Sequence, residues 1–460
     1  MKYRREKDCI GTKEIPADAY YGVHGSRAEE NFRITGRKIS PYLIIAIAQI
    51  KKACAESNKQ AGILDSQRAF FIEQACDEIV EGRYHKEFIV DAIQGGAGTS
   101  TNMNANEVIA NIALVKAGHN KGEYQYCHPN DHVNMSQSTN DVYPTAVKLA
   151  LYRMSIDLIE ELDLIYQAFM KKSQEFSQII KLGRTQLMDA VPVTLGQEFH
   201  AYGAAVRRNK TRIEKAMKEL LCVNLSGTAI GTGINVPTYY RERIIHNLRL
   251  VTGIEFKGCG DLIDGTQNID CFSSLSSAVK TCAISLSKIA NDIRLMNSGP
   301  CGGIGEIKIP AKQNGSSIMP GKINPVIPEV VSQCAYAVAG NDLAVTMACE
   351  AGQLELNAFE PLIFDRVSES LKLLKNGVNT FRVNCIEGIV ANSERCNELL
   401  EQSTALSTAL CPVLGYYETV DIARDFLINK NPIIDNAKKK GLSDREICQI
   451  MDYRRLTGQI

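Results

Sequence analysis

The sequence predicts an all-α protein built around a bundle of long helices, and three observations lead to this fold class. The 14 prolines leave long proline-free stretches, such as those between Pro144 and Pro192 and between Pro237 and Pro300. Because proline disrupts helix interiors, such stretches permit long helices. Apolar residues recur within them every three or four positions, as on one face of a helix. Alternation of apolar and polar residues, which is typical of strands, is scarce.

The longest predicted helix opens at Val142, and its apolar stripe lies in the proline-free stretch after Pro144. Its apolar stripe comprises Val147, Leu151, Met154, Leu158, Leu162, Ile165 and Phe169. Similar spacing runs through about 198–222, 268–297 and 326–358. A helix of about 30 residues is about 45 Å long, and a compact monomer cannot bury a stripe of that length. We therefore expect other subunits to extend the bundle.

Shifts in composition divide the chain into three predicted domains. Residues 1–140 form an N-terminal, mostly helical domain with shorter helical patterns and a glycine-rich stretch at 95–98. Residues 141–390 form the central long-helix bundle, and residues 391–460 form a small C-terminal helical domain. Within this last domain, residues 441–446 indicate a loop leading into a capped final helix.

Composition limits the classes of function. The chain has 52 basic and 52 acidic residues, so its formal net charge is zero and favours neither nucleic acid nor an anionic membrane as a partner. Residues 1–8 lack the apolar stretch of a signal peptide. No run approaches the roughly 18 apolar residues of a membrane span.

The 15 cysteines are scattered, with neither a CxxC pair nor Cys/His ligand spacing, so no zinc site is predicted. Free thiols in a large chain favour a reducing, cytoplasmic location. We interpret these cysteines as small core residues.

The segment 315–325, with sequence GSSIMPGKINP, carries the strongest chemical signal. Its glycines and prolines predict a loop. The loop nevertheless carries adjacent hydroxyls at Ser316 and Ser317, the cation Lys322 and the amide Asn324. This combination suits the binding of a carboxylate beside a hydroxyl that can serve as a base.

Three further polar clusters follow one another along the chain. Residues 95–107, GGAGTSTNMNANE, form a glycine-rich turn before a helix predicted to begin near Asn102, which could cap that helix or bind an anion. Residues 136–141, SQSTND, precede the longest predicted helix. Residues 183–192, GRTQLMDAVP, interrupt two long helices and could simply connect them. Each cluster alone is a weak signal, but the four together are a strong one.

Together these motifs resemble the aspartase/fumarase superfamily, whose members eliminate a group β to a carboxylate to give fumarate. The resemblance runs from Ile10 to about residue 400. It is closer to the aspartate ammonia-lyase branch than to fumarases, because GTST at 98–101, NPVIPEVV at 324–331 and TMACEAGQL at 346–354 are aspartase-like. Fumarases usually carry glutamine at the position of Ser100.

The resemblance implies reversible deamination of L-aspartate to fumarate and ammonia, a carbon–nitrogen lyase activity. Ser316 matches the superfamily's catalytic base, which removes a proton from C3 of the substrate. The resulting charge collects on the C4 carboxylate as an enediolate-like intermediate. The residues that match those gripping this carboxylate are Thr101, Ser138, Thr139 and Ser317.

The remaining predicted contacts hold the other end of the substrate. Lys322, Asn324 and Thr185 match residues that bind the C1 carboxylate, and Asn140 and Gln186 match ligands of the amino group. The resemblance also implies a homotetramer with a shared central helical core, in which three chains build each active site. It implies that no cofactor is consumed, although some members respond to a divalent cation.

Gln186 is an informative departure, since fumarases and some aspartases carry histidine there. A departing hydroxide needs a proton, whereas an ammonium group leaves as neutral ammonia and needs only acceptors to orient it. Glutamine therefore favours an amine substrate. Cys301, where relatives commonly have arginine, is a second departure. The short C-terminus, ending at Ile460, is a third and puts regulation by a longer tail in doubt.

The motif at His128–Asp131 resembles a second anion site of fumarase relatives, but we favour a turn histidine there. His132 and His200 are interpreted as structural. Three alternatives remain: a fumarate hydratase, an ammonia-lyase for a substituted aspartate, and a non-catalytic structural protein on the same scaffold. Retention of Ser316, Lys322 and the other motif residues argues against the last of these.

Overall fold

The computed structural model describes residues 2–459 and confirms the all-α prediction. Strands in this part of the chain pair only as short two-stranded sheets. Five long helices dominate the chain: α5 (Thr139–Glu175), α6 (Leu195–Glu219), α9 (Asp270–Met296), α10 (Val326–Glu350) and α11 (Glu360–Asn384). None of the described helices is both long and apolar enough to span a bilayer.

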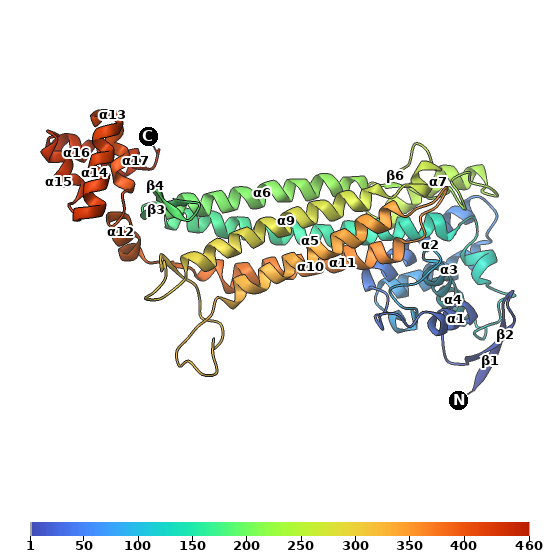
Figure 1. Ribbon diagram of the computed structural model, residues 1–460. Helices are drawn as coiled ribbons and strands as arrows, with labels where there is room; N and C mark the ends of the chain where they lie inside the picture. Colours follow the sequence, from blue (N-terminus) through green and yellow to red (C-terminus); the bar gives the residue numbers. More distant parts are fainter. Residues whose placement is uncertain (1, 460) are drawn as a thin grey trace. The chain divides into compact units, whose positions relative to one another are not determined.

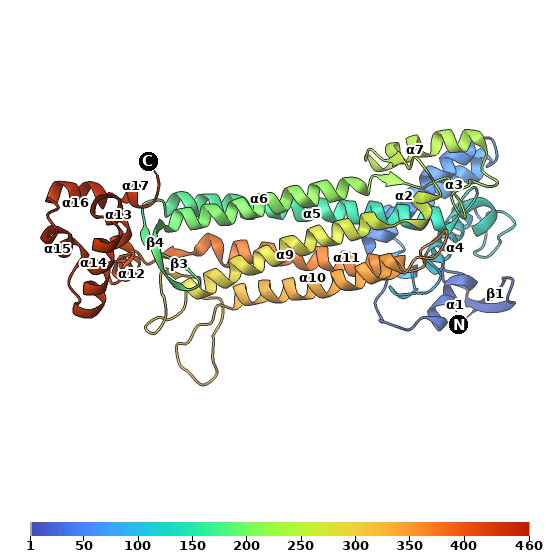
Figure 2. The ribbon, with the colours of Figure 1, turned by 45° about the horizontal axis from the view of Figure 1, so that its top comes forward.

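The described chain forms two compact units, and each long helix passes from one into the other. Unit 1 comprises residues up to Ile159, Thr211–Thr281 and Tyr336–Leu374, whereas unit 2 comprises Glu160–Lys210, Cys282–Ala335 and the residues from Lys375 onward. Within each unit, segments of the long helices lie side by side (Figures 1 and 2). The predicted division at residues 140 and 390 stays a prediction.

Unit 1 adds shorter helices packed on one another. They are α1 (Val23–Asn31), α2 (Pro41–Gln60), α3 (Ser66–Val80), α4 (Thr99–Lys116), α7 (Thr238–Thr252) and α8 (Asp264–Gln267), with η1 (His85–Glu87) and the π-helical turn η2 (Pro129–Val133). Its strands are β1 (Tyr3–Lys7) with β2 (Thr12–Pro16), and β5 (Cys222–Val223) with β6 (Lys257–Gly258). Helix α2 contacts both α3 and α7.

Unit 2 contains the antiparallel hairpin of β3 (Ile180–Thr185) and β4 (Met188–Thr194), and the pair β7 (Ile307–Lys308) and β8 (Val390–Ala391). Its C-terminal helices gather into a cluster (Figure 2): α12 (Ser393–Glu401), α13 (Cys411–Leu414), α14 (Tyr416–Asn429), α15 (Ile433–Lys439), α16 (Asp444–Ile450) and α17 (Tyr453–Leu456), with η3 (Ile386–Gly388) and η4 (Ala405–Leu410). A separate hydrophobic cluster around Ile422, Phe426 and Ile433 holds them together.

The predicted apolar stripe of α5 is buried along its whole length, and none of its seven residues exceeds 8% exposure. In unit 2 the stripe meets an aromatic cluster, in which the Phe169 ring lies 5.9 Å from Tyr202 and 6.4 Å from Phe381. Each large buried apolar side chain contributes roughly 1.5–3 kcal/mol. Periodicity therefore identified the core face of this helix correctly.

Several boundaries differ from the sequence predictions. Helix α5 begins at Thr139 rather than Val142, and α4 begins at Thr99 rather than near Asn102. Helix α10 ends at Glu350 rather than near 358, because the chain turns at Gly352, where a Cβ would lie 3.1 Å from the Asn357 amide nitrogen. Residues 183–192 form a β-hairpin rather than a plain connection, since their backbone groups pair between β3 and β4.

Two other expectations need correction. The capping box at Ser443 and Glu446 is present at α16, but α17 follows, so α16 is not the final helix. The cysteines are free, and seven are buried, but Cys9, Cys222, Cys301 and Cys448 are exposed. Cys9 and Cys301 lie in loops, where helical periodicity reveals little about burial, while Cys222 lies on β5 and Cys448 on the exposed side of α16.

Candidate active site

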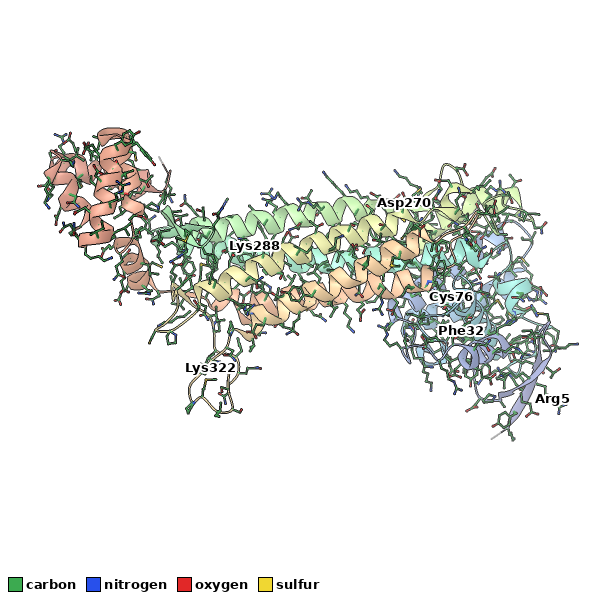
Figure 3. All side chains as sticks on the ribbon, viewed as in Figure 1. Arg5, Phe32, Cys76, Asp270, Lys288 and Lys322 are labelled. Carbon is green, nitrogen blue, oxygen red and sulfur yellow. The ribbon has the colours of Figure 1, made fainter. Side chains whose placement is uncertain are left out.

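The loop predicted at 315–325 connects α9 and α10 in unit 2 and projects from their ends, with Lys322 on it (Figure 3). Its base is closed by backbone and amide contacts. The Gly315 N–H donates to the Lys322 carbonyl at 2.8 Å, and Asn324 Nδ2 donates to the Gly315 carbonyl at 2.7 Å. A Cβ on Gly315 would lie 2.6 Å from that Lys322 carbonyl oxygen, so only glycine permits this closure. Ser316, Ser317, Lys322 and Asn324 thus occupy one closed loop.

Ser316 has an environment suited to negative charge. Its Oγ accepts hydrogen bonds from the backbone N–H groups of Ile318 at 3.1 Å and Met319 at 2.9 Å. These donors leave the hydroxyl proton free to be lost, and they would strengthen if Oγ became an alkoxide, because hydrogen bonds to charged acceptors are stronger than those to neutral ones. The loop therefore supplies part of the stabilisation that a serine base needs.

Lys322 is exposed and Asn324 is half-buried. One N–H of the Asn324 side-chain amide donates to the Gly315 carbonyl. The second N–H and the side-chain oxygen are available for a ligand. In the unliganded chain, Lys322 has the freedom to reach a carboxylate brought to the loop. Exposure of these polar groups is consistent with a site that is complete only when substrate and other parts of the assembly cover it.

Thr185 and Gln186 lie at the tip of the β3–β4 hairpin, also in unit 2. Thr185 pairs with Met188, so Gln186 and Leu187 form a two-residue turn. Both turn residues have positive φ, 54° and 65°. Two-residue hairpins favour this conformation, but residues with side chains adopt it at a cost. The turn presents the exposed Gln186 amide to solvent.

In unit 1 the glycine-rich turn leads directly into α4. Gly96, Ala97 and Gly98 all have positive φ, and a Cβ on Gly98 would lie 2.4 Å from the buried Tyr143 ring. Gly98 is thus required both by its backbone conformation and by close packing. The turn places Thr101 in the first turn of the helix, where its N–H donates to the Gln94 side chain at 2.9 Å.

Thr101 has an unsatisfied hydroxyl. Its side chain is fully buried, yet its Oγ1 has no hydrogen-bond partner within residues 2–459. A buried polar atom without a partner costs stability and calls for an explanation. A ligand oxygen would supply the missing partner, which agrees with the role predicted for Thr101.

Ser138, Thr139 and Asn140 open α5. Ser138 Oγ accepts from the Asn140 N–H at 3.2 Å, and Thr139 Oγ1 accepts from Asn102 Nδ2 at 3.0 Å. This second bond joins the starts of α4 and α5. The structure therefore brings the four predicted unit 1 residues into one polar region at two helix N-termini, where free N–H groups favour anions.

Pro144 helps to fix Asn140. A proline six residues into a helix cannot donate to the carbonyl four residues earlier, here that of Asn140. Asn224 Nδ2 fills this vacancy at 2.9 Å, while Asn140 Nδ2 donates to the Ala229 carbonyl at 2.8 Å. The side-chain oxygen of Asn140 is the acceptor that an ammonium group would need.

Sequence reasoning missed the groups beneath this region. Lys51 is fully buried and donates to Asn134 Oδ1 at 2.7 Å and to Gln137 Oε1 at 2.9 Å. Burial lowers the pKa of Lys51 to about 8. Burial also raises the pKa of Asp141 to about 6, against the opposing N–H donors of Ser138 and Thr228 and the charge of Lys51. Lys51 lies on the apolar face of α2. A charged residue on that face was the only sequence signal that could have identified it as a supporting group.

The same region draws on a second glycine-rich segment, residues 226–233, that sequence reasoning did not single out. The Thr228 N–H donates to Asp141 Oδ2 at 3.0 Å, and Thr228 Oγ1 is buried without a partner among the described residues. Ser226 and Thr228 both have positive φ. Its alternating Gly and Thr residues were a detectable signal of a tight turn.

The histidines of the 128–132 segment are turn residues in this structure. His128 Nδ1 accepts from the N–H groups of Asn130 and Asp131, each at 3.1 Å, and so caps η2. His132 Nδ1 accepts from the His128 N–H at 2.7 Å. With these nitrogens occupied as acceptors, both rings stabilise the turn, as favoured from the sequence. His200 is exposed on α6.

The predicted residues thus fall into two groups. Unit 1 holds Thr101, Ser138, Thr139 and Asn140, and unit 2 holds Thr185, Gln186, Ser316, Ser317, Lys322 and Asn324. The first group combines hydroxyls with two helix N-termini, and the second combines the tip of the β3–β4 hairpin with a closed loop that carries two hydroxyls, a cation and an amide.

Known proteins with similar sequences and structures agree with this chemistry. A family model described as "Lyase" matches residues 11–340. The aspartate ammonia-lyase of Pseudomonas aeruginosa is 50% identical over 444 residues, covering 96% of this chain and 94% of that protein. The aspartate ammonia-lyase of Bacillus subtilis is 47% identical over 434 residues, covering 94% and 91%.

Two solved structures share the fold. A protein described as fumarate lyase:delta crystallin from Brucella melitensis, bound to cobalt, has a TM-score of 0.96 at 48% identity and covers 99% of both chains. Class II fumarase from Schistosoma mansoni has a TM-score of 0.94 at 30% identity, covering 98% of both chains. These matches over nearly the whole chain show that it belongs to the aspartate ammonia-lyase family of the aspartase/fumarase superfamily.

Proposed function

We propose that this chain catalyses the reversible deamination of L-aspartate to fumarate and ammonia. The observation that carries the proposal is the Ser316 loop, which gives a serine oxygen two backbone N–H donors at 3.1 and 2.9 Å and also carries Lys322. Relatives at 47–50% identity are aspartate ammonia-lyases, whereas the fumarase match is at 30%. An aspartate rather than a malate substrate also fits Gln186.

In the proposed reaction, the Ser316 alkoxide removes one proton from C3 of L-aspartate. The electron pair moves onto the C4 carboxylate, which becomes an enediolate-like dianion. Stabilising this charge supplies most of the rate enhancement. Thr101, Ser138, Thr139 and Ser317 donate hydrogen bonds to this carboxylate, and support for this role comes from the buried hydroxyl of Thr101, which has no partner within residues 2–459.

The C–N bond then breaks, the electron pair of C3 forms the double bond, and ammonia leaves with the C–N pair. Lys322, Asn324 and Thr185 hold the C1 carboxylate during this step. The side-chain oxygens of Asn140 and Gln186 orient the amino group without donating a proton. The proton on Ser316 passes to solvent, which restores the base.

We further propose that the enzyme is a homotetramer whose active sites each combine residues of three chains. Support comes from the outer face of α10, where Tyr336, Leu343 and Met347 are each more than 60% exposed. Between Glu329 and Glu350, the only charged residue of α10 is the buried Asp342. An uncharged, partly apolar helix face of this length is typical of a subunit interface. Sedimentation should give about four times the chain mass of 50.7 kDa.

No cofactor is consumed in this scheme, because each step uses side chains alone. The superfamily resemblance additionally predicts a response to divalent cations, which a rate measurement before and after chelation, and again with Mg²⁺ restored, would detect. No group of three or more His, Cys, Asp or Glu side chains suited to a metal occurs within residues 2–459.

The proposed function is tested by following fumarate absorbance with L-aspartate, L-malate and N-substituted aspartates as substrates. We expect fumarate from L-aspartate and little from the others. The Ser316→Ala variant should keep its fold and its substrate affinity but lose more than nine-tenths of kcat, because the hydroxyl acts only in the transition state. Faster turnover of malate or of a substituted aspartate would replace the assignment with one of those activities, and a Ser316→Ala enzyme with a tenth of wild-type kcat would place the base elsewhere.

A further inference from the structure

Unit 2 contains a buried four-charge cluster that the proposed reaction does not use. Glu306 is fully buried, and its Oε1 lies 2.7 Å from Arg184 Nη1 while its Oε2 lies 2.9 Å from Lys181 Nζ. Lys181 Nζ also lies 2.8 Å from Glu198 Oε1. Burial would lower the pKa of Lys181, but the charges of Glu198 and Glu306 outweigh it and raise that pKa. The cluster therefore sets the buried cation Lys181 and the half-buried cation Arg184 against two carboxylates, of which Glu306 is fully buried and Glu198 half-buried.

The members of this cluster lie on segments that also carry substrate-binding residues. Lys181 and Arg184 belong to β3, and Arg184 directly precedes Thr185 and Gln186. Glu306 lies on the segment from α9 to the Ser316 loop, and the Glu306 carbonyl accepts from the Asn392 N–H at 2.8 Å. Through Arg184, Glu306 connects the hairpin to the segment that leads from α9 to the Ser316 loop.

The hairpin needs such an anchor. Its turn holds Gln186 and Leu187 at positive φ, a backbone conformation that is strained for residues with side chains. Its ladder is also interrupted by a register shift at Gly183, where a Cβ would lie 2.5 Å from the Val191 carbonyl oxygen. Such a bulge re-aims the strand beyond it. Arg184, whose side chain contacts Glu306, is the residue directly after this bulge.

Stability alone gives a poor reason for the cluster. Burying the charges of Lys181 and Glu306 has a large desolvation cost, and apolar replacements of buried ion pairs are often as stable or more so. A buried ion pair does, however, fix one arrangement of the segments that it joins. Its geometry would set the position of the hairpin tip more strictly than apolar packing would.

We propose that Glu306 is a positioning residue of the reaction. Through Arg184, it holds the strained β3–β4 turn so that Thr185 and Gln186 meet the C1 carboxylate and the amino group of the substrate. The proposal rests on the substrate roles given above to Thr185 and Gln186. Loss of the contact would loosen the turn, so substrate binding would weaken while the serine base and the C4 carboxylate grip stay in place.

The test compares Glu306→Gln with the double variant Glu306→Gln/Arg184→Gln. The single variant leaves Arg184 without its carboxylate, so its unfolding temperature should fall. In the double variant Lys181 keeps Glu198 as its partner and no buried charge is left alone, so stability should recover. We expect KM for L-aspartate to rise at least tenfold in both variants, with kcat changing less than threefold. Recovery of stability without recovery of KM is the signature of a positioning role.

A matched control is Glu161→Gln, which removes a half-buried carboxylate of unit 2 that pairs with Arg382 Nη2 at 3.6 Å. This variant should lower stability without changing KM. The cluster would have only a structural role if KM stayed at the wild-type value in both Glu306 variants. The same conclusion would follow if KM rose wherever the unfolding temperature fell in the two Glu306 variants and in Glu161→Gln.

A second readout is independent of activity. The chain contains no tryptophan, so Met188→Trp, at the exposed start of β4, gives a single reporter of the hairpin. Its fluorescence anisotropy should fall when Glu306→Gln is added and stay constant when Glu161→Gln is added. Constant anisotropy in both would overturn the proposal. The two proposals can fail separately. If Thr185→Val leaves KM unchanged, but Glu306→Gln lowers the anisotropy of the Met188→Trp reporter, then the substrate role of Thr185 is wrong and the anchoring by Glu306 stands.

Discussion

The unsatisfied hydroxyl of Thr101 leads to a prediction in which stability and activity change in opposite directions. Thr101→Val replaces the hydroxyl by a methyl group of nearly the same volume, and both residues are β-branched with similar helix propensity. Because Oγ1 is buried without a partner in the unliganded chain, its removal should stabilise the protein. The expected gain is about 1–3 kcal/mol, the cost of an unsatisfied buried polar group.

The same change should weaken catalysis. In the proposed reaction Thr101 donates to the C4 carboxylate as its charge grows, and a hydrogen bond to a charged group contributes about 1.5–3 kcal/mol. Its loss corresponds to a decrease of about 10- to 150-fold in kcat/KM, since 1.36 kcal/mol is a factor of ten. Urea unfolding without substrate, at fixed protein concentration, measures the first effect and steady-state kinetics the second.

Thr419→Val provides the matched control. Thr419 is also a buried helical threonine, but its Oγ1 donates to the Gly415 carbonyl at 2.8 Å. Removing a satisfied hydroxyl should lower stability by about 1 kcal/mol and leave kcat/KM unchanged. If Thr101→Val behaved like Thr419→Val, with lower stability and normal kcat/KM, the Thr101 hydroxyl would be a structural group and the reasoning from its missing partner would be wrong.

Three further predictions concern the other end of the substrate and the buried acids. Lys322→Met should weaken aspartate binding by about 2–4 kcal/mol through loss of a charge pair. Lys322→Arg should not restore binding fully, because the planar guanidinium group does not match a site built for the compact ammonium group of lysine. A wild-type KM in the methionine variant would contradict the assigned contact. Gln186→Leu should lose more aspartase activity than Gln186→Glu, because leucine offers the ammonium no acceptor, and full activity of the leucine variant would make Gln186 a spacer. Burial raises the pKa of Glu360 from 4.5 to about 8, so the stability that this acid contributes is present below pH 4.5 and is lost as the pH rises through about 8. At one pKa unit per 1.36 kcal/mol this loss is about 5 kcal/mol; Glu360→Gln should therefore flatten the pH profile of urea unfolding between pH 5 and 8.5, and a profile parallel to wild type would refute the buried titration.

By itself, the sequence determined the fold class, the family and the chemical character of the site. Helical periodicity is local, so the stripe from Val147 to Phe169 could be read directly and proved buried along its length. The serine loop could be found because glycine and proline restrict the backbone wherever they occur, and because its polar residues are contiguous. The helix and loop predictions therefore rested on patterns among residues that are close in sequence.

Only the tertiary structure showed where the supporting groups lie. Lys51 and Glu306 are separated in sequence from the residues they support, and Asp141 accepts from Thr228, which lies far along the chain. A charged residue within a helical pattern does not reveal that it will be buried. The helix starts also shifted by a few residues, because Asn224 supplies the hydrogen bond that Pro144 cannot give to Asn140 and so permits α5 to begin at Thr139. Desolvation and hydrogen-bond satisfaction depend on every segment that packs around a group. Desolvation and hydrogen-bond satisfaction are therefore determined only in the folded chain, whereas helical periodicity and turn formation depend on residues that are neighbours in sequence.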